Sequence, residues 1–496
     1  MSNLDHRLAE ARAEAAIAGL PRGHFIDGAF VAPLEGGEME SFDPGLGRPF
    51  ASFANGSQAD VDRAVQSARK AQKAWARTAP AERGRILRRI ADLILEEGRR
   101  LALVEMFDAG KRLREAEGDV RSAARGFEYY AGAADKLEGA QIPVGEGYLA
   151  YTVQEPVGVV AQIIPWNYPL TSAVRGVAPA LACGCSVVLK PAEQTPFTAL
   201  LLAEICKRAG LPDGVFNVVT GTGARVGGPL TAHGDIDHIT FTGSVGTGSR
   251  VMSEAARNIT RVTLELGGKS PHVLLADCDL DRAIPDAMGA IFENAGQICS
   301  AGSRLIVERA IRDEVAERLS KAMAGLRTGH GLANLDVGAV NSAEQLARVE
   351  AHVEGARGRG NSIISGGTRL SPEDAPGGWY FAPTLIEAPD PADAIVQEEI
   401  FGPVLTLQVA DDFDHAVALA DGTGYALAGA IHTRDLTKAV RFAREVDAGQ
   451  IYVNEYFAAP FEVPFGGNGK SGFGRAKGLE GLKTYCKLKS VTMKLV

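Results

Sequence analysis

Short apolar runs alternate with helix-length segments from residue 157 onward. VGVVAQII, SVVLK, VFNVVTG, HITFTG and RVTLELGG each have the length of a strand, and a segment long enough for a helix separates each from the next. Continuously apolar strands that alternate with helices predict a parallel sheet covered on both faces and joined by right-handed crossovers. The predicted fold class is therefore α/β. A second alternation of the same kind runs from about 268 to 474.

Polar and glycine-containing motifs stand where these predicted strands end. IIPWN, LKPAE, FTGS and LELGG all fall at such ends. Ligands of parallel sheets bind at the carboxyl ends of the strands, so the pattern predicts a binding crevice there. The glycine fingerprint of dinucleotide-binding proteins is absent, because GTGARVG at 221–227 has one residue too many. Gly243 and Ser244 instead open a predicted helix, whose free backbone N–H groups suit a pyrophosphate.

A thiol, a carboxylate and an amide could serve acyl chemistry. Cys299 lies in FENAGQICSAGSR, where small neighbours leave a thiol accessible, and Glu265 stands in an apolar strand. Asn167 lies in PWNYP. The three supply a nucleophile, a base and an oxyanion donor. A cysteine alone is more often a packing residue, an asparagine beside proline often only stabilises a turn, and periodicity cannot show that the three meet.

Composition narrows the class of protein. A chain of 496 residues predicts two or three domains, and a net charge of −9 disfavours nucleic-acid binding. The six cysteines lack CxxC spacing and a histidine cluster, so we expect neither a disulfide framework nor a metal site. No run reaches 18 apolar residues and the N-terminus has no apolar core. We therefore expect a cytoplasmic protein that does not bind membranes.

Seven motifs together resemble a known family. PWNYP, LKPAEQTP, FTGS, LELGGKSP, NAGQIC, EEIFGP and PFGGNGKSGFGR occur in this order. The series resembles the NAD(P)-dependent aldehyde dehydrogenase superfamily over nearly the whole chain. The resemblance implies a parallel-sheet NAD-binding domain (1–137 and 157–267), an α/β catalytic domain (268–474) and a small β oligomerisation element. The oligomerisation strands would be 138–156 and 475–496, in a homodimer or homotetramer.

The same resemblance implies roles for the three candidate catalytic residues. Cys299 would attack an aldehyde to give a thiohemiacetal, Asn167 would hold the oxyanion, and Glu265 would activate the water that releases the acid. An acylating, CoA-dependent relative is one alternative, although such relatives typically lack the deacylating glutamate. A non-catalytic NAD-binding protein is another, although all three catalytic groups are present here.

The cofactor residues also come from the resemblance. Glu193, beside Lys190, would bind the adenosine ribose and repel a 2′-phosphate, which favours NAD over NADP. Glu399 would bind the nicotinamide ribose and Phe401 would pack near the ring. A surface ion pair and a core aromatic are the plainer interpretations of these residues. The expected cofactor-binding residues are Ile163, Ile164, Trp166, Lys190, Glu193, Gly223, Gly243, Ser244, Leu266, Glu399 and Phe401.

The substrate is less well defined. Arg175 stands where many relatives carry tryptophan, and succinate-semialdehyde dehydrogenases look similar there, so a carboxylated aldehyde is one hypothesis. Alternatively Arg175 pairs with Glu293 or Glu462, and the substrate is an aromatic or aliphatic aldehyde. Candidate pocket residues are Tyr168, Arg175, Ile298, Ser300, Phe457 and Phe465. Ala476 and Gly176 replace a glutamate and a lysine of many relatives, so any proton route through those positions must differ.

Overall fold

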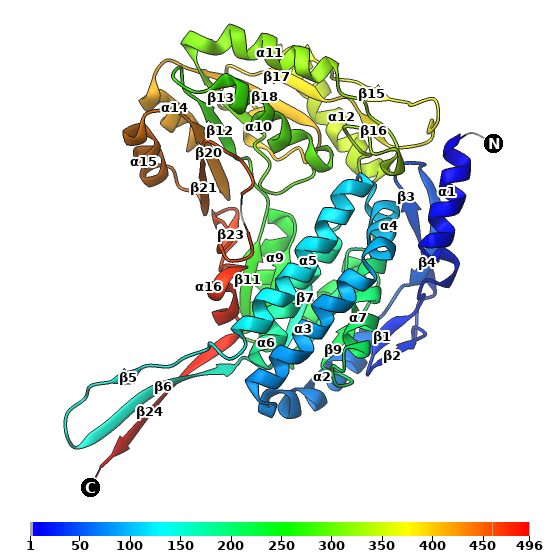
Figure 1. The fold of residues 1–496 in the computed structure, drawn as a ribbon, viewed down its shortest axis with the longest axis vertical. Coiled ribbons are helices and arrows are strands. Elements are labelled where there is room, and N and C mark those ends of the chain that lie inside the picture. Colours follow the sequence, from blue (N-terminus) through cyan, green and yellow to red (C-terminus); the bar gives the residue numbers. More distant parts are fainter. Residues whose placement is uncertain (1–2, 459, 496) are drawn as a thin grey trace.

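The computed structural model describes residues 3–458 and 460–495 (Figure 1). Its largest sheet has eight strands in the order β2-β1-β9-β8-β7-β10-β11-β23. The strands from β9 to β11 run parallel, which confirms the predicted α/β class. Their bounds are β1 (His24–Ile26), β2 (Ala29–Val31), β7 (Val159–Ile163), β8 (Ser186–Lys190), β9 (Phe216–Val218), β10 (His238–Thr242), β11 (Arg261–Glu265) and β23 (Gly472–Phe473).

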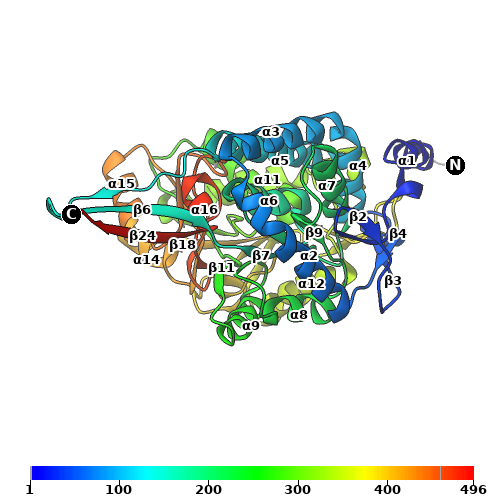
Figure 2. The ribbon, with the colours of Figure 1, turned by 90° about the horizontal axis from the view of Figure 1, so that it is seen from below.

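Helices cover both faces of this sheet, because successive side chains of a strand point to opposite faces. Val160 and Leu189 face one core with α6 and α7, and α3, α4 and α5 form a further layer outside them (Figure 2). Val159 and Val188 face the opposite core with α2, α8 and α9. The bounds are α2 (Gln58–Arg77), α3 (Pro80–Glu96), α4 (Gly98–Ala109), α5 (Leu113–Ala133), α6 (Pro169–Cys183), α7 (Phe197–Arg208), α8 (Gly228–Ala232) and α9 (Val245–Ala256).

A second sheet of seven strands has the order β14-β17-β18-β13-β12-β20-β21. Its strands are parallel except for the β14–β17 pair. The strands are β12 (Pro271–Leu274), β13 (Arg304–Glu308), β14 (Ser362–Ser365), β17 (Thr384–Glu387), β18 (Val404–Ala410), β20 (Ala428–His432) and β21 (Gln450–Val453). The surrounding helices are α10 (Leu280–Phe292), α11 (Arg312–Ala324), α12 (Ala343–Gly358), α13 (Ala394–Gln397), α14 (Phe413–Ala420) and α15 (Leu436–Glu445).

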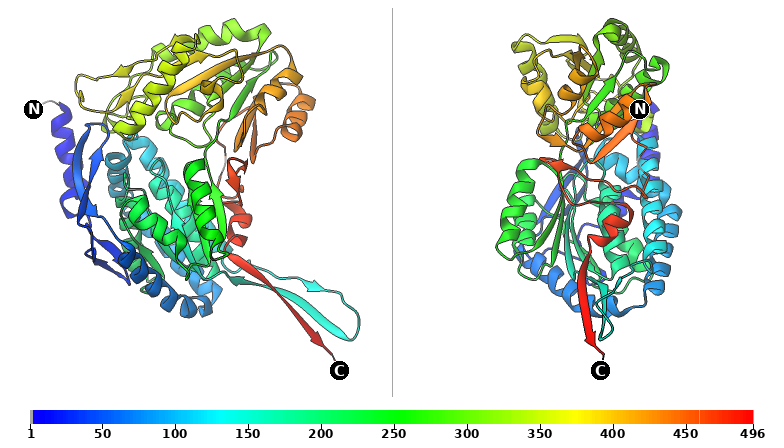
Figure 3. Two further views of the ribbon diagram at one scale, coloured as in Figure 1. Left: turned by 180° about the vertical axis from the view of Figure 1, so that it is seen from behind. Right: turned by 90° about the vertical axis from the view of Figure 1, so that its left-hand side faces the viewer.

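A third sheet, β24-β6-β5, projects from the body of the molecule (Figure 3). In it β24 (Cys486–Lys494) is an edge strand that pairs along its length with β6 (Tyr148–Pro156), which in turn pairs with β5 (Gln141–Ile142). Before β24, the segment assigned above to oligomerisation contains a helix, α16 (Gly478–Lys483), which packs against α6. The projecting part of the C-terminal segment therefore starts at Cys486, while the domain boundaries themselves stay a prediction.

Besides β1 and β2, the N-terminal part contains α1 (Asn3–Glu14) and a hairpin of β3 (Glu38–Asp43) and β4 (Arg48–Ala54). It precedes α2, whose first turn is held by a capping box between Ser57 and Asp60. Shorter two-stranded pairs join β15 (Arg369–Leu370) to β16 (Tyr380–Phe381) and β19 (Tyr425–Ala426) to β22 (Asn468–Gly469). Within residues 3–458 and 460–495, every helix is too short or too polar to cross a bilayer.

Candidate active site

Cys299, Glu265 and Asn167 line one cavity of about 150 Å³. Glu265 is the last residue of β11, and Asn167 lies in the loop between β7 and α6. Cys299 comes from the second sheet's side, in the loop that leads from α10 to β13. Three residues that are far apart in sequence thus meet where the two sheets adjoin, which is the arrangement that acyl chemistry on a thiol needs.

The Cys299 thiol is half-buried and protonated at neutral pH. Burial raises the pKa of Cys299 to about 11, opposed by the charge of Arg175 and reinforced by the carboxylates of Glu399 and Glu265. A thiol in this state becomes a nucleophile only when a base takes its proton or when positive charge accumulates beside it. The neighbouring groups therefore decide its reactivity.

The Glu265 carboxyl group is buried, at 3% exposure, and neither oxygen has a side-chain hydrogen-bond partner among the described residues. Burial raises the pKa of Glu265 to about 7, against the opposing charges of Arg175 and Arg475. A carboxylate that stays unpaired in the interior is costly, which marks a group kept for a task rather than for stability. A pKa near neutrality suits a general base.

The Asn167 side chain is also buried, and its Nδ2 donates to the Gln297 carbonyl at 2.8 Å. A side-chain amide has two N–H groups, so this bond uses one of them, and Asn167 lines the cavity. The loop that carries Asn167 follows directly from β7, and its fixed strand end sets the position of the amide. Asn167 and Cys299 therefore approach the cavity from different sheets.

A larger cavity of about 680 Å³ lies further along the first sheet and is lined by Ile163, Lys190 and Gly223. Lys190 ends β8, and its Nζ lies 2.9 Å from Oε2 of Glu193. Burial would raise the pKa of Glu193, but Lys190 outweighs it and the pKa is lowered, so the carboxylate is charged. Beside these residues, the Ile164 N–H donates to the Lys190 carbonyl at 3.2 Å.

Gly243, Ser244, Leu266, Glu399, Phe401 and Trp166 all line the cavity that holds Cys299. Ser244 is the N-cap of α9, so the free N–H groups of that helix open beside the cavity. Glu399 accepts the Gly268 N–H at 2.9 Å, and a Cβ on Gly267 would lie 2.2 Å from the Glu399 carboxylate.

These residues fit an extended dinucleotide. Lys190 lines the cavity of about 680 Å³, and its partner Glu193 lines a neighbouring cavity of about 530 Å³. The cavity with Cys299 opens beside the N-terminus of α9, and the missing side chain of Gly267 leaves room for the Glu399 carboxylate. Trp166 and Phe401 form a T-shaped pair with ring centroids 5.2 Å apart, and Phe401 has a positive φ of 58°. An aromatic held in the left-handed region is strained, which is typical of a functional site.

The predicted substrate residues divide into two groups. Tyr168 and Arg175 line the cavity with Cys299, and the Arg175 guanidinium lies 4.6 Å from the centroid of the Phe465 ring. Ile298, Ser300 and Phe457 do not line that cavity. Ile298 and Ser300 are buried and Phe457 packs edge-on against Tyr456.

Neither predicted partner of Arg175 is paired with it. Glu462 forms an ion pair with Arg125, and Glu293 makes no ion pair with Arg175 in the described part of the chain. The alternative in which Arg175 is neutralised by one of these two acids is therefore wrong.

Lys477 escaped the sequence analysis although it adjoins the site. Its Nζ lies 5.5 Å from the ring centroids of both Phe461 and Phe465, and its backbone has φ 59° and ψ 173°, a region that favours glycine. Burial lowers the pKa of Lys477 to about 8, with Arg175 adding to the effect. The sequence did offer one indication of this residue, because Lys477 follows Ala476 directly after the last motif, which ends at Arg475.

Arg348 was missed for a different reason. It is an exposed residue of α12, but it lines both the Cys299 cavity and a neighbouring cavity of about 530 Å³. An arginine on an amphipathic helix indicates a solvated face unless the fold brings that face to a site. Within residues 3–458 and 460–495, no group of three or more His, Cys, Asp or Glu side chains could hold a metal ion.

Comparisons with known proteins agree on one family. The model of the aldehyde dehydrogenase family matches residues 30–491. The chain is 41% identical over 475 residues to a putative aldehyde dehydrogenase, DhaS, of Bacillus subtilis, which covers 95% of each chain. A solved putative aldehyde dehydrogenase from Burkholderia cenocepacia has 44% identity and a TM-score of 0.94, covering 96% of this chain and 100% of that one. An indole-3-acetaldehyde dehydrogenase in complex with NAD⁺ has 38% identity and a TM-score of 0.96, covering 98% and 99%.

Proposed function

The chain belongs to the aldehyde dehydrogenase family and is an NAD-dependent aldehyde dehydrogenase, and we propose that it oxidises an anionic aldehyde to the carboxylic acid through Cys299. The observation that carries the catalytic assignment is the meeting of Cys299, Glu265 and Asn167 in one cavity. Their chemical types and their separate origins in the two sheets support a nucleophile, a base and an oxyanion donor.

In the first half of the reaction, Cys299 Sγ gives its proton to the Glu265 carboxylate and attacks the aldehyde carbon, and the carbonyl oxygen becomes an oxyanion. Asn167 donates its free N–H to that oxygen, while its other N–H stays on Gln297. NAD⁺, when bound, supplies the hydride acceptor by which the thiohemiacetal becomes a thioester. Glu399, Ser244 and the Lys190–Glu193 pair are the residues that would hold it.

In the second half, Glu265, after releasing its proton to solvent, takes a proton from water. The resulting hydroxide attacks the thioester carbon, the C–S bond breaks, and the acid and the Cys299 thiolate are released. Its pKa of about 7 keeps a useful fraction ionised at neutral pH. Because no described side chain is hydrogen-bonded to Glu265, its carboxylate can accept the water's proton. A carboxylate in this position also disfavours the acylating, CoA-dependent alternative, in which water must not intercept the thioester.

Charge at the cavity supports an anionic substrate. The cationic side chains of Arg175 and Lys477 both lie near the ring of Phe465, beside Glu265. Arg175 forms no ion pair with any described carboxylate, and guanidinium groups bind carboxylates in bidentate fashion. An aromatic aldehyde is the second candidate, since Tyr168 lines the cavity and one comparison protein is an indole-3-acetaldehyde dehydrogenase.

The test compares succinate semialdehyde with butanal in the wild type and in Arg175→Met, with NADH formation as the signal. We expect kcat/KM for the semialdehyde to fall about 10- to 100-fold in the variant, because a charged hydrogen-bond partner is lost, while butanal changes little. Arg125→Met, which removes an exposed arginine near the same helices, is the matched control. If kcat/KM falls equally for both aldehydes in Arg175→Met, the proposal of an anionic substrate is wrong. If product forms only when CoA is present, the proposal that water hydrolyses the thioester is wrong.

We also propose that the chain forms a homodimer or homotetramer through β24. Among residues 3–458 and 460–495, β24 pairs along one edge, with β6, and Leu488 on it is 63% exposed. An unpaired edge strand is a template for another chain. Light scattering on Leu488→Glu should report a smaller assembly than the wild type, whereas an unchanged mass would place the interface elsewhere.

A cytoplasmic location is proposed as well, supported by six cysteines that all remain free thiols.

A further inference from the structure

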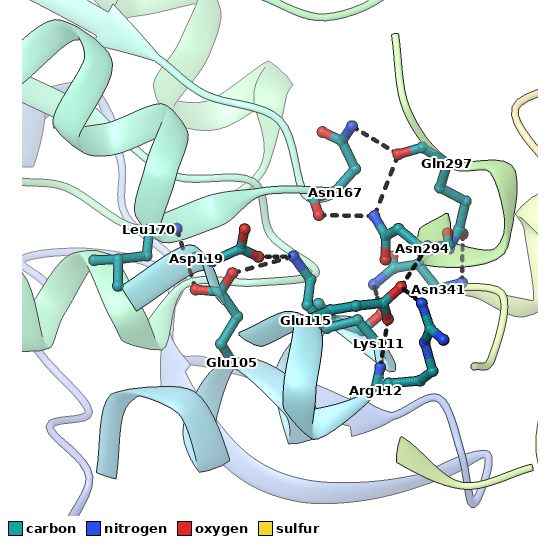
Figure 4. Close-up of polar contacts among 11 residues, drawn as sticks. Glu105, Lys111, Arg112, Glu115, Asp119, Asn167, Leu170, Asn294, Gln297 and Asn341 are labelled. Carbon is teal, nitrogen blue, oxygen red and sulfur yellow. Dashed lines mark hydrogen bonds and ion pairs between the residues drawn. The ribbon is translucent and has the colours of Figure 1, made fainter. Parts of the chain in front are cut away.

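A buried carboxylate outside the cavity holds the loop that leads to Cys299. Glu115 lies in the first turn of α5, and its Oε1 accepts the backbone N–H of Asn294 at 2.8 Å (Figure 4). Its Oε2 accepts the Arg112 N–H at 2.8 Å, and the Arg112 side chain also contacts the carboxylate. Burial would raise the pKa of Glu115, but Arg112 and the two N–H groups lower it, so the group is charged.

The loop held by Glu115 has an unfavourable backbone. Asn294, Ala295 and Gly296 have φ values of 48°, 53° and 74°, so three successive residues occupy the left-handed region. That region is sparsely populated by residues other than glycine, and alanine has no polar side chain to compensate. Such a conformation persists only when the surrounding structure imposes it. The ionised Glu115 is the group that binds the first N–H of this turn.

The Asn294 side chain connects the same loop to Asn167. Its Nδ2 lies 3.1 Å from the Asn167 carbonyl oxygen and 3.3 Å from the Gln297 carbonyl oxygen. The Asn167 Nδ2 donates to that Gln297 carbonyl at 2.8 Å. The Gln297 carbonyl, two residues before Cys299, therefore accepts hydrogen bonds from the side-chain amides of both Asn167 and Asn294 (Figure 4). The position of the Asn167 amide and the position of the thiol loop are mechanically linked.

The helices around Glu115 also bind the segment that follows Asn167, at Tyr168 and Leu170. Glu105 of α4 accepts the Leu170 N–H at 3.3 Å and lies 3.2 Å from the Lys111 ammonium. Lys111 also pairs with Asp119 of α5 and lies 4.2 Å from the centroid of the Tyr168 ring. One buried ionic cluster therefore fixes the segment that carries the amide, while Glu115 fixes the loop that carries the thiol.

We propose that Glu115 and Asn294 are positioning residues that set the Asn167 amide against the Cys299 thiol, and so define the oxyanion site. This inference rests on the proposed function, because it assigns the Asn167 amide to the oxyanion. Neither residue touches the reacting atoms. Glu115 acts through the backbone of Asn294, and Asn294 acts through the Asn167 and Gln297 carbonyls.

The test separates two reactions of the same thiol. Acylation of Cys299 by p-nitrophenyl acetate passes through an oxyanion, whereas alkylation by iodoacetamide does not. We expect Glu115→Gln to lower the acylation rate about 10- to 100-fold, because removing one oxyanion donor costs about 10²–10³ and misplacing it costs less. The alkylation rate should change less than about threefold. Glu117→Gln, an exposed carboxylate on the same helix that pairs with Arg99, should leave both rates unchanged.

A second variant keeps the test decisive if Glu115→Gln folds poorly. Asn294→Gly removes the Nδ2 donor while glycine tolerates the left-handed backbone, and it should give the same selective loss. Equal losses in acylation and alkylation, or no loss in either, would overturn the inference. Asn167→Ala is the reference. If it spares acylation, the proposed oxyanion role of Asn167 fails, whereas a selective loss in Asn167→Ala without one in Glu115→Gln or Asn294→Gly refutes the positioning role alone.

Discussion

The two large sheets meet the cavity with opposite ends of their strands. From the first sheet, Glu265 ends β11 and the Asn167 loop follows β7, so this sheet offers its carboxyl ends. From the second sheet, Cys299 precedes β13 and Glu399 precedes β18, so this sheet offers its amino ends. The proposed base and oxyanion donor thus lie on one side, and the proposed nucleophile and nicotinamide-ribose ligand lie on the other.

This difference separates two kinds of site. Loops at the carboxyl ends of parallel strands form the usual ligand crevice, and α9 adds a helix N-terminus there. Loops at the amino ends have no such general role. In this chain they carry the strained residues instead, with positive φ values at Asn294, Ala295 and Phe401. The second sheet supplies reactive groups by imposing loop conformations, and the first supplies them by the regular geometry of its strands.

The largest effect should come from the amino-end side. Cys299→Ala removes the proposed nucleophile, and we expect dehydrogenase activity to fall by at least about 10³-fold. NAD binding, followed by fluorescence titration, should stay nearly unchanged, because the first sheet carries most of the proposed cofactor residues. Cys278→Ala is the control, since Cys278 follows the carboxyl end of β12, at the edge of the second sheet opposite to its amino ends. Substantial activity in Cys299→Ala would remove the second sheet from the chemistry.

The next largest effect should come from Glu265 at the carboxyl end of β11. Its pKa of about 7 predicts that kcat falls as the pH drops through 7, because the protonated carboxyl group cannot accept a proton from water. Glu265→Gln should lower kcat about 10²- to 10⁴-fold and leave a burst of one NADH per site, measured by stopped flow. If kcat of Glu265→Gln still falls as the pH drops through 7, or if the variant shows no burst of NADH, the base is another residue.

The carboxyl-end residues were accessible from the sequence for a physical reason. Apolar runs marked β7, β8, β10 and β11, and the rule for parallel sheets then placed Asn167, Lys190, Ser244 and Glu265 at their ends. The α/β class follows from the same alternation. No comparable rule places Glu399 or Phe401, and those residues entered through family resemblance alone.

Some features depend on contacts that no local pattern contains. The charge of Arg175 was visible, but its position on Phe465 beside Lys477 depends on a chain segment about 300 residues away. Glu115 looked like an ordinary residue of a helix start, and its bond to Asn294 joins elements 179 positions apart. Arg348 likewise becomes a cavity residue only because α12, which packs against the second sheet, brings it to the cavity that holds Cys299.

A moderate effect should distinguish the two ends of the cofactor site. Glu193→Gln removes the charge beside Lys190, so the ratio of kcat/KM for NAD to that for NADP should fall about tenfold, because a 2′-phosphate is no longer repelled. Glu254→Gln, which alters a carboxylate lining the cavity that Lys190 also lines, should leave the ratio unchanged. An unchanged ratio in Glu193→Gln would place the adenosine ribose away from the carboxyl end of β8.

The smallest effect should come from Arg348, the exposed second-sheet contribution to both neighbouring cavities. Its charge lies near Glu399, whose pKa burial raises to about 7 while the Gly268 N–H and nearby cations, Arg348 included, oppose the rise. Arg348→Ala should raise KM for NAD about two- to threefold at low salt, with kcat unchanged, because an exposed charge is strongly screened. The difference should disappear in 0.5 M NaCl, and Arg357→Ala on the same helix should show none. A change in kcat that persists in salt would mean that α12 positions the Glu399 end of the site rather than only attracting the anionic cofactor.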